Sequence, residues 1–290
     1  MALNGAVNTV VYKEDWMEVL QQELDEANKF EDICRVEYTS EYLIHNPYLT
    51  DPSVHVIARG TPYTFEAVVR TDESVTINQG KVIPQFIDRA DLAQSGYMRQ
   101  MELAQRQGIL LKEAIESAVF ANHANMTDFG SGDITGGTVG DTTQITVSAT
   151  NIDDIITHII RVIRVANGES LFNRNGGFIV WRPADFQLLT SFMMANGFNS
   201  ADLALRKGAQ QGVEYMGLTH YTSNLLTANH VIAGVKKVIH LGILNTTYGQ
   251  IMVDDKDPNL QSGISVVTRV DFETKVWNKT KPVVLDCNVI

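Results

Sequence analysis

The sequence predicts an α+β fold built around one long helix. An uninterrupted helical pattern of apolar residues runs from Asp91 to Asn122. Short β-type segments precede it between Ile33 and Asp88, and alternating strand and helix patterns follow from Gly177 onward. Because elements with these periodicities bury their apolar faces only by packing together, we expect sheets that rest against the long helix.

Length and charge describe a folded, acidic chain. The sequence has 290 residues, with 23 Lys or Arg against 34 Asp or Glu, so its formal charge is −11. At about 150 residues per domain, two compact units or one elongated unit are expected. The negative charge disfavours attraction to nucleic acid. No apolar run approaches the roughly 20 residues of a membrane span, no signal peptide is expected, and Cys34 and Cys287 fit neither a disulfide framework nor a zinc motif.

The beginning of the chain predicts an arm followed by an extended hairpin. From Lys13 to Asn28 we expect an amphipathic helix, because apolar residues repeat at helical spacing: Trp16, Val19, Leu20, Leu24 and Ala27. Further on, the β-type runs are Val54 to Ala58, Tyr63 to Arg70 and Ser74 to Asn78. Few of these residues could form a core of their own, so the hairpin is expected to rest on the remaining chain or on a neighbouring subunit.

The segment from Asp91 to Asn122 predicts one long helix. Its apolar stripe advances by three or four residues at each step without a proline: Ala93, Tyr97, Met101, Ala104, Gly108, Leu111, Ile115 and Ala118. At 1.5 Å per residue such a helix is about 45 to 50 Å long. It can therefore serve as the spine of the molecule.

Glycine-rich sequence separates this helix from a second one. Thr127 to Asp141 is expected to be a flexible loop, because its glycines and small polar residues offer little to pack. Gln144 to Ser148 resembles a brief strand, and Asn151 is a suitable N-cap for a helix that Gly168 ends. Isoleucines on one face predict that this helix is deeply buried: Ile152, Ile155, Ile156, Ile159, Ile160 and Ile163.

From Gly177 onward, strand and helix patterns alternate. Phe178 to Trp181 predicts a strand, Pro183 the first turn of a helix, and Ser200 the start of a short one. Ile264 to Val276 alternates apolar and polar residues, which predicts a long strand with one solvent-facing side. Further strands are expected around Leu218 to Thr222, Val231 to Val235, Val238 to Leu244 and Val283 to Val289.

No motif indicates a phosphate-binding or calcium-binding loop. The glycines between Gly130 and Gly140 lack the lysine of a Walker A motif and precede a β-type segment rather than a helix. The acidic run that starts at Asp254 has Leu260 where a calcium loop needs glycine and Val266 where it needs glutamate. A solvated turn explains that run.

The histidines and carboxylates form no recognised catalytic motif. His220, His230 and His240 lie on different predicted strands, so we interpret them as core or strand-edge residues and expect no metal site and no cofactor. Nucleophile motifs are also missing, and the chain is not expected to be an enzyme. One alternative from that class stays open, an α/β enzyme with a site in residues 176–262 where His220, His230 and Asp185 share a pocket.

Two stretches, together with the order of the elements, resemble a known family. Ser74–Lys81 leads through Phe86–Ser95 into the long helix, as a strand followed by Ile-Asp-x-x-Asp and then helix. Gly177–Phe186 reads as a strand followed by a proline-started helix, and Tyr215–Leu218 is a further likeness. In these features the chain resembles the major capsid proteins of tailed bacteriophages over nearly its whole length.

The resemblance implies a tailed-phage major capsid fold and a division of the chain. Residues 1–50 correspond to an N-terminal arm and residues 51–88 to an extended β-hairpin loop. Residues 89–175 and 263–290 correspond to a peripheral domain that contains the spine helix. Residues 176–262 correspond to an axial domain.

The same resemblance implies a function and partners. Such proteins self-assemble, through hexamers and pentamers, into an icosahedral shell that encloses double-stranded DNA without sequence-specific binding. Scaffold, portal and decoration proteins are further implied partners, with no membrane. The implied location is the virion, after assembly in the host cytoplasm. A nanocompartment shell protein of the same fold is the close alternative.

Five residues are expected at contacts between subunits. Trp16 and Leu20 lie in the arm, and Arg70, Glu73 and Lys81 lie in the extended loop. Some relatives cross-link their shells through a loop lysine, for which Lys81 is the sole candidate here. We expect no cross-link, because the reaction needs a desolvated, neutral lysine.

Overall fold

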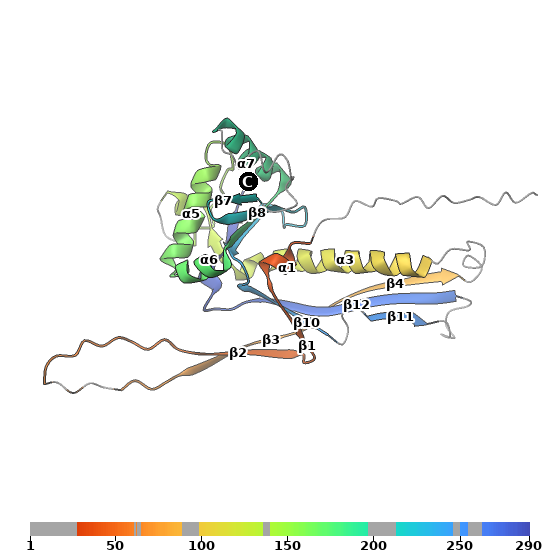
Figure 1. Ribbon diagram of the computed structural model, residues 1–290, viewed down its shortest axis with the longest axis horizontal. Helices are drawn as coiled ribbons and strands as arrows, with labels where there is room; N and C mark the ends of the chain where they lie inside the picture. Colours follow the sequence, from red (N-terminus) through yellow and green to blue (C-terminus); the bar gives the residue numbers. More distant parts are fainter. Residues whose placement is uncertain are drawn as a thin grey trace, which may run out of the picture.

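Two sheets and one long helix organise the chain (Figure 1). The structure is a computed structural model that describes residues 28–60, 62, 65–88, 99–135, 140–196, 213–245, 250–254 and 263–290. The expected arm helix from Lys13 and the short helix after Ser200 lie outside these residues. Within them, no helix is long and apolar enough to cross a membrane.

A five-stranded sheet carries the long helix. Its central strand, β12, pairs antiparallel with three others, and β1 extends the sheet by pairing parallel with β10. The helix α3 lies along β12 and β4 (Figure 1). The strands are β1 (Arg35–Thr39), β4 (Gln79–Asp88), β10 (Ile239–Leu244), β11 (Gln250–Asp254) and β12 (Gly263–Val276), and α3 spans Arg99–Ala121.

The predicted long strand is present, and the predicted spine helix is present from Arg99 to Ala121, while its expected start at Asp91 lies outside the described residues. Along β12, Val270, Phe272 and Val276 are buried and the Arg269 side chain is exposed, as alternation predicts, but Asp271, expected on the solvent-facing side, is only 5% exposed. Polar groups join the helix to the sheet at Gln107, which donates to Gln85 at 2.8 Å and accepts a hydrogen bond from Thr268.

A six-stranded sheet forms the core of a second part of the molecule, beside the end of α3 (Figure 1). All five residues of its inner strand β6 are buried, because β9 and β8 flank it while helices cover it (Figure 1). The C-terminal strand β13 pairs with β9 in this sheet. The strands are β5 (Thr127–Phe129), β6 (Gly177–Trp181), β7 (Val213–Tyr215), β8 (Leu218–Thr222), β9 (His230–Val235) and β13 (Val284–Asn288).

Helices pack on the six-stranded sheet. Two of them confirm predictions from the sequence, one on the burial of isoleucines and one on the start of a helix at a proline. In α5 (Ile152–Val165) five of the six stripe isoleucines are buried and Ile160 is partly buried. Pro183 begins α7, as expected for a residue without a backbone N–H. The remaining elements are α1 (Phe30–Ile33), η1 (Asn122–Asn125), α4 (Ser131–Ile134), α6 (Glu169–Asn175), α7 (Pro183–Ala195) and η3 (Lys281–Val283).

The Asn151 side chain does not cap α5, contrary to the sequence-based expectation. Its Oδ1 accepts a hydrogen bond from the Ser148 amide at 2.8 Å, and its amide donates to the Thr146 carbonyl at 2.8 Å. The side chain therefore stabilises the turn before the helix. The strand expected at 144–148 is also wrong, because only Ile145 forms a bridge, to Val289.

The expectation of a flexible loop is wrong for residues 127–135. This stretch forms β5 and α4, and the fully buried Asp133 carboxylate holds it in place. Its Oδ2 accepts hydrogen bonds from the amides of Gly130 and Asp141 at 3.0 and 3.1 Å, while Arg161 donates to its backbone carbonyl. The hydrogen bonds of one buried carboxylate thus order a segment whose small side chains offer little to pack.

Gly130→Ala is expected to lower the free energy of unfolding by about 1–3 kcal/mol. An added Cβ would lie 2.6 Å from the backbone oxygens of both Asp141 and Thr143, which cannot move aside as a flexible side chain does. Gly108→Ala is the matched control, because the same addition on α3 meets nothing within 4 Å. It should stabilise by about 0.5–1 kcal/mol. Urea unfolding measures both, and equal effects would contradict the packing argument.

Candidate interaction surface

A hairpin projects from the body of the molecule (Figure 1). Strands β2 (Leu43–Leu49) and β3 (Arg70–Thr76) pair antiparallel at its base. Beyond them, the described residues from 50 to 69 form no strand, so the strand expected at Val54 to Ala58 is wrong. The strand expected from Tyr63 to Arg70 is wrong for residues 65–69, whereas Arg70 begins β3 and residues 63 and 64 lie outside the described part of the chain. The extended hairpin itself is present, and its outer part is less regular than alternation in the sequence suggested.

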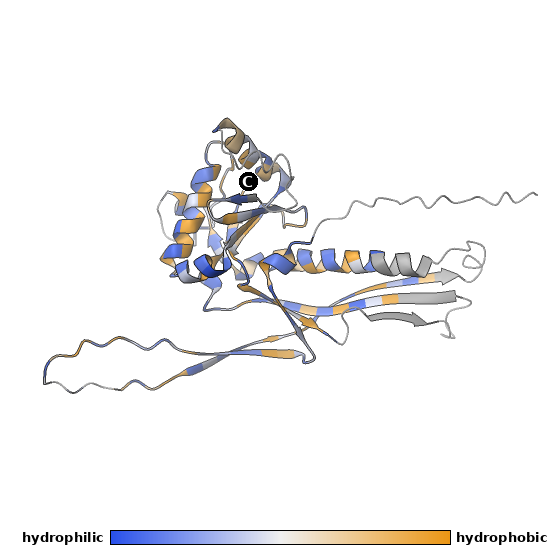
Figure 2. Cartoon of the chain, viewed as in Figure 1, coloured by the Kyte–Doolittle hydropathy of each residue, from blue (hydrophilic) through white to orange (hydrophobic). Residues whose placement is uncertain are grey.

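The outer part of the hairpin exposes apolar side chains. The exposed fractions are 98% for Val54, 99% for Val56, 86% for Phe65 and 81% for Val68. Figure 2 shows these hydrophobic segments along both arms of the projection, far from the core. Burial of each such side chain against a partner would stabilise the contact by roughly 1.5–3 kcal/mol. A surface of this kind is typical of a contact with another molecule.

Hydrogen bonds between the two arms hold this outer part together. The amide of Thr50 donates to the carbonyl of Val69 at 3.0 Å. Farther out, Glu66 accepts from the Ser53 amide at 3.1 Å and contacts His55 at 2.8 Å. The bond from the Ser53 amide lowers the pKa of Glu66, so the carboxylate stays ionised and keeps accepting.

The base of the hairpin is anchored on the body. Val75 and Ile77 are buried there. Glu73 accepts a hydrogen bond from the Asn278 amide at 3.2 Å, and Lys279 forms an ion pair with Asp51 at 2.8 Å. Among the described residues, these contacts tie the hairpin to the body at its base and at Asp51, and the exposed apolar side chains lie farther out.

The structure separates the residues expected at subunit contacts. Arg70 and Glu73 lie on β3 in the hairpin. Lys81 lies on β4 in the five-stranded sheet, paired in register with Val270, so it is not a residue of the projecting part. It lines a surface hollow together with Gln79, Ala114, Ser117, Ala118, Ala121, Asn122 and Thr274. Trp16 and Leu20 lie outside the described residues.

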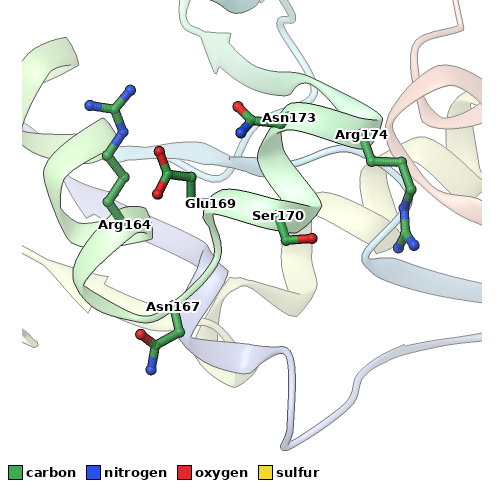
Figure 3. A pocket seen from close by; sticks show the side chains of 6 residues that line it. All are labelled: Arg164, Asn167, Glu169, Ser170, Asn173 and Arg174. Atoms are coloured by element: carbon green, nitrogen blue, oxygen red, sulfur yellow. The ribbon is translucent and has the colours of Figure 1, made fainter.

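A broader hollow lies where α5 is followed by α6 (Figure 3). Polar and charged side chains line it, with Arg164 and Arg174 at its opposite ends in the view. Its other lining residues are Asn167, Glu169, Ser170 and Asn173. None of the three residues expected in an enzymatic pocket lines it.

Those three residues have separate partners. Asp185 forms two hydrogen bonds with the Arg182 guanidinium, at 2.6 and 3.0 Å. His220 accepts from the Trp181 indole at 2.9 Å and donates to the Tyr215 carbonyl at 3.2 Å. His230 instead contacts Asp286. Neither hollow is lined by any of the three residues, and the fully buried His220 is a core residue, as expected.

Burial lowers the pKa of His220 to about 4. Because the folded pKa lies below the ordinary value of about 6.5, the neutral imidazole favours folding above pH 6.5, and that contribution is lost as the pH falls toward 4. We expect a loss of about 3 kcal/mol in the free energy of unfolding over this range. Urea unfolding of His220→Gln, which cannot titrate, should show a shallower pH dependence. Identical dependences in the two proteins would contradict this assignment.

A polar cluster ties the first described residues to the body of the molecule. The Glu116 side chain, 1% exposed on α3, accepts a hydrogen bond from the Lys29 amide at 2.7 Å and lies 4.0 Å from the Lys29 ammonium. Nearby, Asp32 pairs with Lys236 at 2.7 Å and also contacts the Tyr221 hydroxyl. Sequence reasoning missed Glu116, because a single polar residue beside an apolar helical stripe carries no signal of burial.

Comparisons with known proteins agree on the fold. A chain from Mycobacterium phage Che8 has a TM-score of 0.70 at 18% identity, covering 94% of this chain and 95% of that one. The capsid of an empty GTA particle gives 0.71 at 11% identity, covering 94% and 93%. A virus-like particle from Pyrococcus furiosus gives 0.57 at 11% identity, covering 90% and 92%. No protein-family model and no curated protein match the sequence. The predicted α+β fold is confirmed over almost the whole chain.

Proposed function

We propose that this chain, which has the fold of phage major capsid proteins, is the repeated subunit of an icosahedral shell that encloses double-stranded DNA. The observation that carries the proposal is the projecting hairpin. Its outer part exposes Val54, Val56, Phe65 and Val68 while its base is anchored. In a shell, the apolar side chains of each hairpin would be covered by a neighbouring subunit.

Physical reasons support a shell over a closed dimer. The apolar side chains are carried on a projection, so they can reach a different surface of a neighbouring subunit, and such a heterologous contact can repeat around a ring. Many such contacts act together, so each can be weak while the assembly is stable. The role is structural rather than catalytic.

The finer parts of the proposal concern cargo and partners. Under it, the chain forms hexamers and pentamers, meets scaffold, portal and decoration proteins, and resides in the virion after assembly in the host cytoplasm. A charge of −11 fits a shell that encloses DNA without gripping it. The second candidate is a nanocompartment shell, favoured by the likeness to a virus-like particle from Pyrococcus furiosus.

Assembly and cargo are tested separately. Light scattering and negative-stain microscopy of the purified chain should show closed particles, and a monomer under all assembly conditions would overturn the proposal. Particles purified from infected cells should hold nuclease-protected DNA, whereas protein cargo without DNA would favour the nanocompartment. A denaturing gel should show no covalent ladder, which tests the expectation that Lys81 forms no cross-link.

A further inference from the structure

Two histidines and one carboxylate meet where the spine helix ends. His123 lies in η1, directly after α3, His230 begins β9, and Asp286 lies in β13. The His123 Nδ1 atom is 3.0 Å from Asp286 Oδ2, and the His230 Nδ1 atom is 2.9 Å from Oδ1. The two imidazole rings are stacked, with centroids 3.8 Å apart and planes at 28°. Both Nδ1 atoms therefore face the same carboxylate.

Burial and charge make this cluster different from a surface ion pair. The Asp286 side chain is 2% exposed, and each histidine is 20% exposed. Within the described residues, the hydrogen bonds to its carboxylate come from these two rings. A buried carboxylate needs a positive partner, and a metal ion held by the carboxylate and both rings would supply that charge. Each Nδ1 atom that faces the carboxylate can offer a lone pair to such an ion when its ring carries the proton on Nε2.

The donor atoms have the chemistry and spacing of a transition-metal site. The three ligand atoms lie within 4.8 Å of one another. Bonds of about 2.0–2.2 Å to one ion place pairs of ligand atoms roughly 3.3 Å apart, so small side-chain shifts suffice. Imidazole nitrogens suit zinc and its neighbours, whereas calcium and magnesium prefer oxygen ligands alone.

We propose that His123, His230 and Asp286 bind one divalent transition-metal ion of the zinc class, with water in the remaining position. The ion joins the end of the spine helix to the six-stranded sheet through β9 and β13. Its binding site exists only in the folded chain, so the ion stabilises the fold. The partial exposure of the two histidines provides its entry path.

Zinc titration of the untagged, metal-free chain tests the site. Equilibrium dialysis should give one Zn²⁺ per chain, and the midpoint of thermal unfolding should rise by about 5 °C at saturation. His123→Asn and His230→Asn should each weaken zinc binding at least about tenfold. Co²⁺ in place of Zn²⁺ should show the visible absorption of a nitrogen-coordinated ion, and each substitution should remove it. The unassembled chain is used, so the result does not depend on shell formation.

His45→Asn is the matched control. His45 also contacts a carboxylate, Asp72, at 2.7 Å, but on the exposed hairpin and without a second histidine. Its substitution should leave zinc binding unchanged. The proposal is overturned if the wild-type chain binds no zinc at micromolar concentrations, which would leave a hydrogen-bonded cluster only. Equal weakening by His45→Asn, or an equal thermal shift with Mg²⁺, would also overturn it.

Discussion

Replacing Val56, Phe65 and Val68 by serine is expected to abolish particle formation and leave the folded chain intact. These side chains are 99%, 86% and 81% exposed, so their removal costs the isolated chain little. In a shell each of them would be buried against a neighbour, where its loss removes roughly 1.5–3 kcal/mol per contact. Because every subunit carries the change, the yield of particles in light scattering should fall at least tenfold.

Val165→Ser provides the control for this triple variant. Val165 is 65% exposed at the end of α5, on the body rather than on the hairpin. It should change neither the particle yield nor the midpoint of urea unfolding. If the triple variant assembles normally, the hairpin is not the principal contact. If Val165→Ser blocks assembly equally, the loss of particles follows from removing any exposed apolar side chain and is not specific to the hairpin.

Glu116→Ala should lower the free energy of unfolding by about 3–5 kcal/mol. Removal of this carboxylate leaves the Lys29 ammonium, in a side chain only 5% exposed, without its buried counter-charge, and removes the acceptor for the Lys29 amide. The loss of stability arises because Lys29 stays buried without Glu116, and not because the attraction between the two charges is strong. Urea unfolding monitored by circular dichroism measures the loss.

A double variant separates the cost of the uncompensated Lys29 ammonium from the cost of the Lys29 amide that has lost its acceptor. Lys29→Met combined with Glu116→Leu replaces the buried charges by apolar groups and should recover the part of the loss that the unpaired ammonium causes, while the part from the Lys29 amide without its acceptor should remain. Glu41→Ala is the surface control, with an expected change within about 0.5 kcal/mol, because residue 41 is exposed. A Glu116→Ala protein as stable as the control would show that the pair contributes nothing.

Periodicity in the sequence predicted the elements that bury one face. The stripe in α5 and the alternation in β12 were both readable, because each buried residue recurs at the spacing of its own element. Pro183 similarly marked the start of α7 through its fixed backbone angle. These signals are local, so they do not depend on what the element packs against.

Predictions based on composition were less successful. The small residues between Gly130 and Asp141 suggested mobility, yet the Asp133 carboxylate orders part of this segment through backbone amides. The β-type run from Val54 to Ala58 suggested a strand, but it finds no partner strand among the described residues. Composition indicates which conformations a segment favours, whereas an ordered segment also needs hydrogen-bond partners for its backbone, which other parts of the chain must supply.

The sequence by itself predicted the α+β class, the long helix, the deeply buried second helix and several of the strands, β6 and β12 among them. Only the tertiary structure decided which distant groups meet. His230 was grouped with His220 and His240 in the sequence, but strand pairing brings it to Asp286, and the end of the spine helix brings it to His123. The physical reason is that periodicity identifies the buried face of each element, while the register between elements depends on packing across the whole chain.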